Sequence, residues 1–130
     1  MFLLYSLLVT GPAYGNQRAS IALQFSYALL ERGHSLDTVF FYQDGVYNAN
    51  RFSAPASDEV DLVRAWSKLA KQHQIELYVC VAAALRRGVS DALQSSLLQR
   101  EGDNLQLGFK LTGLGQLGLA AISCDRFIQF

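Results

Sequence analysis

Runs of apolar residues alternate with segments of helical periodicity along the chain. The runs that predict strands lie at residues 2–9, 39–42, 75–81 and 125–130. The helical segments between them lie near residues 18–32, 57–70, 82–88, 91–100 and 111–123. Strands that are apolar almost throughout are typical of a parallel sheet covered on both faces. The pattern therefore predicts an α/β fold, a single-domain three-layer α/β/α sandwich with a mainly parallel sheet, over residues 1–130.

The first helical segment carries two apolar stripes, which predict a helix that is buried on more than one side. Gly33 is expected to end this helix. The stripes consist of Ile21, Phe25 and Leu29 and of Leu23, Tyr27 and Leu30.

Turn-forming residues at 44–57 predict a long loop before the second helix. Ser57 is a good N-cap, and the acidic residues that follow it suit the positive end of a helix. The helix expected at 111–123 is the least regular, because it contains three glycines. The inward side of the second helix is predicted to hold Val63, Trp66, Leu69 and Ala70.

The composition bears on partners and on nucleic acid. Hydrophobic residues make up 51% of the 130 residues, and the mean hydropathy is +0.15. A domain of this size has much surface to keep polar, so we expect partner subunits to cover part of the apolar excess. Eleven basic and eleven acidic residues cancel, and no basic run is present. Direct tight binding of nucleic acid is therefore not expected.

The apolar opening, MFLLYSLLVTG, could be mistaken for a secretory signal. It has no basic residue, and its apolar run ends within about ten residues, too short to span a bilayer. We interpret it as a buried strand and expect a cytoplasmic protein with reduced thiols and no membrane segment.

Two cysteines, Cys80 and Cys124, are the candidate reactive groups. Cys80 ends a strand and precedes a helix, where backbone N–H groups and the helix dipole favour a thiolate. The alternative is a buried, inert core thiol, and both interpretations stay open on the residues alone. Cys124 is expected to be a packed core residue. His34 and His73 are not spaced with either cysteine as metal ligands, so neither a metal site nor a disulfide framework is predicted.

Two further features are candidate sites. Arg86 and Arg87 either form a solvated helix face or raise the positive potential near an anionic sulfur donor. The segment TGPAYGNQ follows the first strand as a phosphate loop would, but it matches neither common nucleotide motif. A flavin site of the flavodoxin type stays possible at that loop. No histidine is expected beside Cys80, which leaves its thiolate suited to sulfur exchange rather than hydrolysis.

Several long segments in order along nearly the whole chain resemble the DsrE-like sulfur-relay family. They are TGPAYGNQRAS, FFYQDGVYNAN, PASDEVDLVRAW, CVAAALRRGV and GLGQL. The resemblance implies a cytoplasmic sulfurtransferase subunit without a cofactor, in which Cys80 carries a persulfide. It also implies a heterohexamer with TusB-like and TusC-like subunits, a TusA-like sulfur donor and a TusE-like acceptor. The sulfur would end in 2-thiouridine at the wobble position of tRNA.

Other functions remain as alternatives. A DsrE-type subunit of dissimilatory sulfur oxidation shares the fold and the active cysteine. A structural subunit of an α/β oligomer would carry an inert Cys80, and a flavin-binding or nucleotide-binding module would use the first loop. Thiol reactivity and a visible absorbance spectrum separate these classes.

Overall fold

A computed structural model describes all residues, 1–130, and contains one five-stranded sheet in the order β4-β3-β2-β1-β5. All four strand pairs are parallel, so the predicted sheet type is confirmed. The strands are β1 (Leu4–Val9), β2 (Ser35–Phe41), β3 (Glu76–Cys80), β4 (Phe109–Thr112) and β5 (Arg126–Gln129). The helices are α1 (Arg18–Glu31), the 3-10 helix η1 (Gln43–Ala49), α2 (Leu62–His73), α3 (Val81–Arg86), α4 (Ala92–Leu97) and α5 (Gly115–Ser123).

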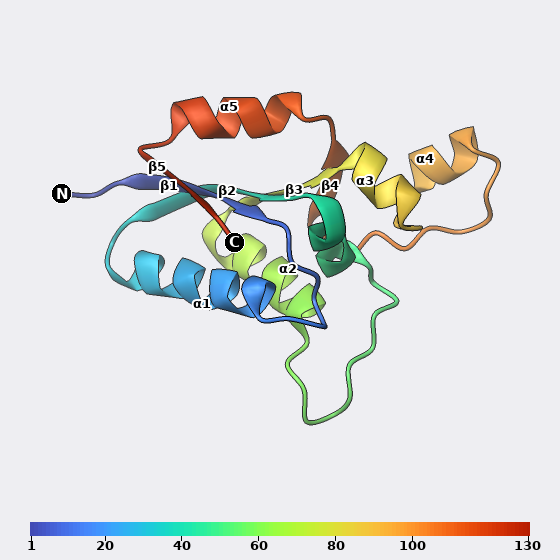
Figure 1. Ribbon diagram of the computed structural model, residues 1–130, viewed down its shortest axis with the longest axis horizontal. Helices are drawn as coiled ribbons and strands as arrows, with labels where there is room; N and C mark the ends of the chain where they lie inside the picture. Colours follow the sequence, from blue (N-terminus) through green and yellow to red (C-terminus); the bar gives the residue numbers. More distant parts are fainter.

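Helices cover both faces of the sheet, which confirms the three-layer arrangement. Helices α1 and α2 lie on one face and α5 lies on the other, while α3 and α4 extend from the end of the sheet (Figure 1). The chain moves in one direction across the sheet from β1 to β4 and then crosses back to the other edge between β4 and β5. Because parallel crossovers are right-handed, these two directions place their helices on opposite faces.

The core between the sheet and α2 is built around one tryptophan. Trp66 is fully buried, and its ring meets that of Phe41 edge-on at 5.2 Å between centroids. Phe41 also packs against Phe109 of β4, at 5.4 Å. All the residues predicted for the inward side of α2 are buried, as Val63, Leu69 and Ala70 show.

The buried side of α1 differs from the two predicted stripes. Small residues, Ala19, Ala22 and Ser26, lie against the sheet together with Leu23 and Leu29, and they let the helix backbone come close. Ile21 is 48% exposed, so its place in a buried stripe was predicted wrongly, whereas the other members of both stripes are buried or pack partly buried against the core. Gly33 follows the helix with φ of +86°, a conformation that favours glycine, as predicted.

The start of α2 was also predicted wrongly. The helix begins at Leu62, not near Ser57, because Asp61 is the N-cap. The Asp61 carboxylate accepts hydrogen bonds from the backbone N–H of Arg64 at 3.4 Å and from its Nε at 2.8 Å. Glu59 is not in the helix, and its carboxylate accepts a backbone N–H from the preceding turn.

Residues 109–112 form strand β4 rather than the start of a helix. They pair with β3 from Leu77–Phe109 to Cys80–Thr112, and Phe109 is buried. Helix α5 begins only at Gly115, after Gly113 has ended the strand region. The expected loop at 44–57 likewise contains most of η1. None of the helices has the length and apolar character needed to cross a membrane.

Candidate active site at the end of strand β3

Cys80 is both the last residue of β3 and the N-cap of α3. Its backbone is extended, with φ of −60° and ψ of 118°, so the chain turns into the helix directly after it. The first turn of a helix leaves backbone N–H groups without intrahelical acceptors, and these groups stabilise an anion nearby. The sequence-based placement of Cys80 is therefore correct.

Cys80 is also buried, with only 3% of its surface exposed. It pairs with Thr112, the last residue of β4, and belongs to the hydrophobic core. The helix η1 packs against β3 and α3, and its residues Val46 and Ala49 are fully buried in the same core. The thiol thus lies in the core at the end of β3 rather than in an open cleft.

A close approach of backbones places η1 at this end of the sheet. A Cβ added at Gly45 would lie 2.1 Å from the carbonyl oxygen of Val9, far inside van der Waals contact. Only glycine lets η1 come this close to the end of β1. The segment after β2 therefore folds across the strand ends instead of leaving them open.

Asn48 fixes η1 from the inside. Its side chain is fully buried, and its Nδ2 donates hydrogen bonds to the carbonyl oxygens of Gly11 at 2.9 Å and Gly45 at 2.8 Å. Its Oδ1 accepts a hydrogen bond from the indole Nε1 of Trp66 at 3.2 Å. One side chain thereby joins the loop after β1, the helix η1 and the helix α2.

The two arginines at the end of α3 have different surroundings. Arg87 Nε donates to Asp44 Oδ1 of η1 at 2.8 Å, and its Nη1 donates to the carbonyl oxygen of Ala83 at 3.0 Å. Arg86 is exposed and makes no ion pair. Arg87 is therefore paired with Asp44. Of the two arginines, only Arg86 fits the interpretation of a solvated helix face.

Neither histidine lies near Cys80, as expected. His34 precedes β2 at the opposite end of the sheet, where its Nδ1 accepts the backbone N–H of Leu3 at 3.0 Å and its ring packs against Tyr5. His34 is half-buried there. His73 is exposed in the last turn of α2. No cluster of three or more His, Cys, Asp or Glu side chains could hold a metal ion.

Cys124 is not the packed core residue that was expected. It is the half-buried C-cap of α5, and its Sγ lies 3.6 Å from the carbonyl oxygen of Ala121. Cys80 ends β3 and Cys124 caps α5, and both are free thiols.

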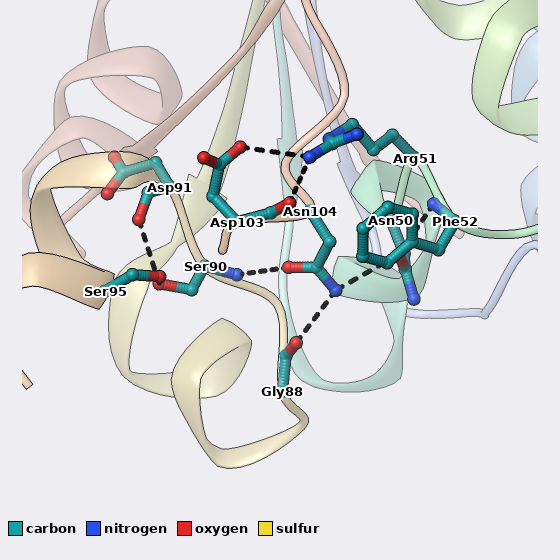
Figure 2. A network of polar contacts seen from close by, with 9 residues as sticks. All are labelled: Asn50, Arg51, Phe52, Gly88, Ser90, Asp91, Ser95, Asp103 and Asn104. Carbon is teal, nitrogen blue, oxygen red and sulfur yellow. Dashed lines mark hydrogen bonds and ion pairs between the residues drawn. The ribbon is translucent and has the colours of Figure 1, made fainter. Parts of the chain in front are cut away.

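A groove of about 440 Å³ runs beside the end of α3 and is organised by Asn104. The Nδ2 of Asn104 donates to the carbonyl oxygen of Gly88 at 2.9 Å and to Asn50 Oδ1 at 3.1 Å, and its Oδ1 accepts the N–H of Ser90 at 2.8 Å. Figure 2 shows this side chain between the segment that follows η1 and the segment that follows α3. Sequence analysis did not predict the roles of Asn48, Asn104 and Asp44, the ion-pair partner of Arg87. In the sequence they are single polar residues in turn-rich segments.

Comparison with known proteins relates the whole chain to one family. Residues 4–130 match the model of the DsrE/DsrF-like family. A protein of Sodalis glossinidius named "Sulfurtransferase TusD" is 75% identical over 130 residues, which covers all of both chains. A protein of the same name from Pectobacterium carotovorum is 62% identical over 126 residues, covering 97% of this chain and 98% of the relative.

Solved structures give the same fold. The crystal structure of the ychN protein from E. coli superposes with a TM-score of 0.77 at 19% identity and covers 100% of both chains. A protein of unknown function, MTH1491 from Methanobacterium thermoautotrophicum, gives a TM-score of 0.65 at 15% identity over 98% of each chain. These likenesses support the three-layer fold.

A parallel α/β/α sandwich with a cysteine at a strand end, together with the match over residues 4–130, defines the class of protein: the chain belongs to the DsrE/DsrF-like family. Its identity of 75% with a sulfurtransferase along the full chain identifies it further, as a sulfurtransferase with a role in a sulfur relay.

Proposed function

We propose that Cys80 accepts sulfur as a persulfide and passes it to an acceptor protein. The observation that carries this proposal is the position of Cys80, at the carboxyl end of a parallel strand and the start of a helix. Ligands and substrates of open α/β sheets bind at this edge. Cys124 lies on α5 and lacks such a position.

The transfer needs no general base if the nucleophile is a thiolate. The Cys80 thiolate attacks the outer sulfur of a donor persulfide, a new S–S bond forms, and the donor S–S bond breaks. Its electron pair leaves with the donor thiolate, so no net oxidation occurs. A thiolate of the acceptor protein then attacks the outer sulfur on Cys80 and restores the Cys80 thiolate. The absence of histidine from the surroundings of Cys80 agrees with this chemistry.

The partners proposed are those that the family resemblance implies, in the cytoplasm. They are TusB-like and TusC-like subunits in a heterohexamer, a TusA-like donor and a TusE-like acceptor, with 2-thiolation of the tRNA wobble uridine as the outcome. Exposed apolar surface supports assembly with other subunits, and among the helices more of the exposed large apolar residues lie on α4 and α5 than on α1, where Ile21 is the only one. The residues of α4 and α5 that carry it are Leu93, Leu97, Leu119 and Ile122.

The burial of Cys80 favours one second candidate. A thiol with 3% exposure is what a structural subunit with an inert cysteine would have. In that case Cys80 would only fill space in the core. A DsrE-type role in sulfur oxidation is the other alternative, and it differs in the partners and not in the chemistry at Cys80.

Sulfur uptake by single-cysteine variants tests the proposal. The complex is incubated with a persulfide donor, and the intact chain should gain about 32 Da, one sulfur atom. Cys80→Ser should abolish this gain, and the matched control Cys124→Ser should keep it. A Cys80→Ser chain that still acquires and passes on sulfur would overturn the assignment, and a wild-type chain that gains none would favour the structural subunit.

The proposal also limits the contact with nucleic acid. Since the chain has a net charge of +0 and no basic run, it should not bind tRNA tightly by itself. A salt-sensitive, submicromolar complex of the isolated chain with tRNA would contradict this expectation.

A further inference from the structure

The helix η1 is tied to the far end of α3 at both of its own ends. In the first turn of η1, Asp44 pairs with Arg87, which is the C-cap of α3. At the other end, the C-cap Asn50 accepts a hydrogen bond from Asn104, which also bonds the carbonyl oxygen of Gly88 just after α3. Cys80 begins the helix whose end carries both ties. In Figure 1, η1 is the teal-green coil that follows β2, at the same end of the sheet as α3.

The two ties differ in strength. The amide tie is part of a network in which Asn104 makes three hydrogen bonds with its side chain, and the backbone N–H of Arg51 adds a bond to its carbonyl oxygen at 2.7 Å. The ionic tie is nearer to solvent, with 25% of the Arg87 side chain and 60% of the Asp44 side chain exposed. Partly exposed ion pairs stabilise weakly, so this tie is the one that opens more readily.

Sulfur transfer requires an opening of this kind. The attacking and leaving sulfur atoms must lie in line with the outer sulfur on Cys80, which a thiol with 3% exposure does not allow. Helices η1 and α3 are among the elements that pack against β3, they also pack against each other, and their buried residues belong to the same core as Cys80. Of these elements, η1 is held from the inside by Asn48, and at its solvent-facing first turn Asp44 ties it to Arg87.

Building on the function proposed above, we propose that Asp44 and Arg87 are positioning residues whose ion pair holds η1 closed over Cys80. The closed state keeps small thiols away from a persulfide on Cys80, and docking of a donor or acceptor protein selects the open state. Without this protection, a small thiolate attacks the outer sulfur, the S–S bond breaks, and its electron pair returns to Cys80. The sulfur is then lost as the persulfide of the small thiol.

Alkylation of the thiols by iodoacetamide tests whether η1 shields Cys80, and it needs no sulfur transfer. Cleavage after Lys and Arg places Cys80 on the peptide 72–86 and Cys124 on the peptide 111–126, so both rates are measured in one sample. When opening is fast and reversible, the rate at Cys80 follows the population of the open state. Loss of a partly exposed pair in Arg87→Gln should raise the Cys80 rate about two- to five-fold and leave the Cys124 rate unchanged.

Two matched control variants and one rescue variant distinguish opening of η1 from a general loss of stability as the cause of faster Cys80 alkylation. Arg86→Gln removes the neighbouring charge, which is unpaired. Lys110→Gln removes another exposed ion pair, with Glu76 at the other end of β3, and in this variant Cys124 is followed on the peptide 101–126. Neither control should change the Cys80 rate, and the exchanged pair Asp44→Arg with Arg87→Asp should return it toward the wild-type value. Equal rates in Arg87→Gln and wild type, or equal acceleration in the controls, would overturn the proposal.

The lifetime of the persulfide gives the functional readout. The complex loaded with sulfur is treated with 2-mercaptoethanol, and the loss of sulfur from the Cys80 peptide is followed by mass; this peptide is 72–86, or 72–87 in Arg86→Gln. Arg87→Gln should lose it about two- to five-fold faster than wild type and Arg86→Gln. Equal lifetimes would contradict the protective role. If no chain carries sulfur on Cys80, the function proposed for Cys80 fails, while the alkylation rates still decide whether the pair covers the thiol.

Discussion

Replacing Asn48 by alanine tests whether the buried amide holds the site together. The substitution removes two hydrogen bonds donated to the carbonyl oxygens of Gly11 and Gly45 and one accepted from Trp66. All three partners lose their bond in a region that water does not reach, since Asn48 and Trp66 are fully buried. The loop after β1, η1 and α2 would then be joined by packing alone.

The expected loss of stability follows from these bonds. A net contribution of about 1 kcal/mol for each intramolecular hydrogen bond gives about 3 kcal/mol for the three. Groups left unpaired in the core add to this, and a little relaxation subtracts from it, so we expect the free energy of unfolding to fall by about 2–4 kcal/mol. A domain of this length typically has a total of about 5–15 kcal/mol, so the loss is a large share.

Urea unfolding followed by far-UV circular dichroism measures this loss for Asn48→Ala. The control is Asn16→Ala, because Asn16 is exposed and makes one local hydrogen bond, to the N–H of Arg18. A double-mutant cycle with Trp66→Phe isolates the bond between the amide and the indole, and we expect a coupling of about 1 kcal/mol. A loss below about 1 kcal/mol in Asn48→Ala would refute the role of this side chain as the anchor of η1.

Three further predictions concern other parts of the molecule. Gly45→Ala should lower the thermal midpoint and reduce the yield of folded protein, because a Cβ there would lie 2.1 Å from a β1 carbonyl oxygen; an unchanged midpoint would contradict the close approach. The hydrogen bond from Lys110 to Glu76 raises the pKa of Lys110, so the stability from this pair is present below about pH 10.4 and is lost as the pH rises through the raised value. In an NMR titration, Glu76→Gln should lower that pKa, and no change would show that the pair is absent in solution. Light scattering should show self-association of the isolated chain and one defined hexamer with TusB-like and TusC-like partners; polar residues at Leu119 and Ile122 should reduce the self-association, and a well-behaved monomer that ignores both partners would contradict the assembly.

The strands that the pattern predicts best are those covered on both faces of the sheet. The runs at 2–9 and 75–81 predict β1 and β3 because both faces of these strands are covered, so nearly every position is apolar. Strand β4 was missed because Lys110 makes one face polar and glycines follow it, which resembles an irregular helix. Pairing with β3, a contact distant in sequence, decides its structure.

The buried side of α1 and the start of α2 depend on contacts that periodicity does not encode. Large apolar residues indicate the inward side of a helix only when the packing distance is large, whereas α1 approaches the sheet through Ala19, Ala22 and Ser26. Ser57 and Asp61 are both good N-caps, and the side-chain contact of Arg64 with Asp61 selects the second.

Part of the candidate site could likewise be predicted from the sequence, and part could not. The position of Cys80 could be predicted, because a strand followed directly by a helix is visible in the sequence. Its burial and its cover could not, because Asp44 and Arg87 are 43 positions apart in the chain and meet only in the folded protein. Asn48 gives no signal either, since its importance comes from three partners in three separate segments.

The central claim is that Cys80 carries the transferable sulfur, and locating that sulfur tests it most directly. The complex is loaded by a persulfide donor, its free thiols and persulfides are alkylated, and the chain is cleaved after Lys and Arg. A gain of about 32 Da should appear on the peptide 72–86, which contains Cys80, and disappear when the acceptor protein is added. Sulfur found instead on the peptide 111–126, with Cys124, or a label on Cys80 that the acceptor cannot remove, would contradict the claim.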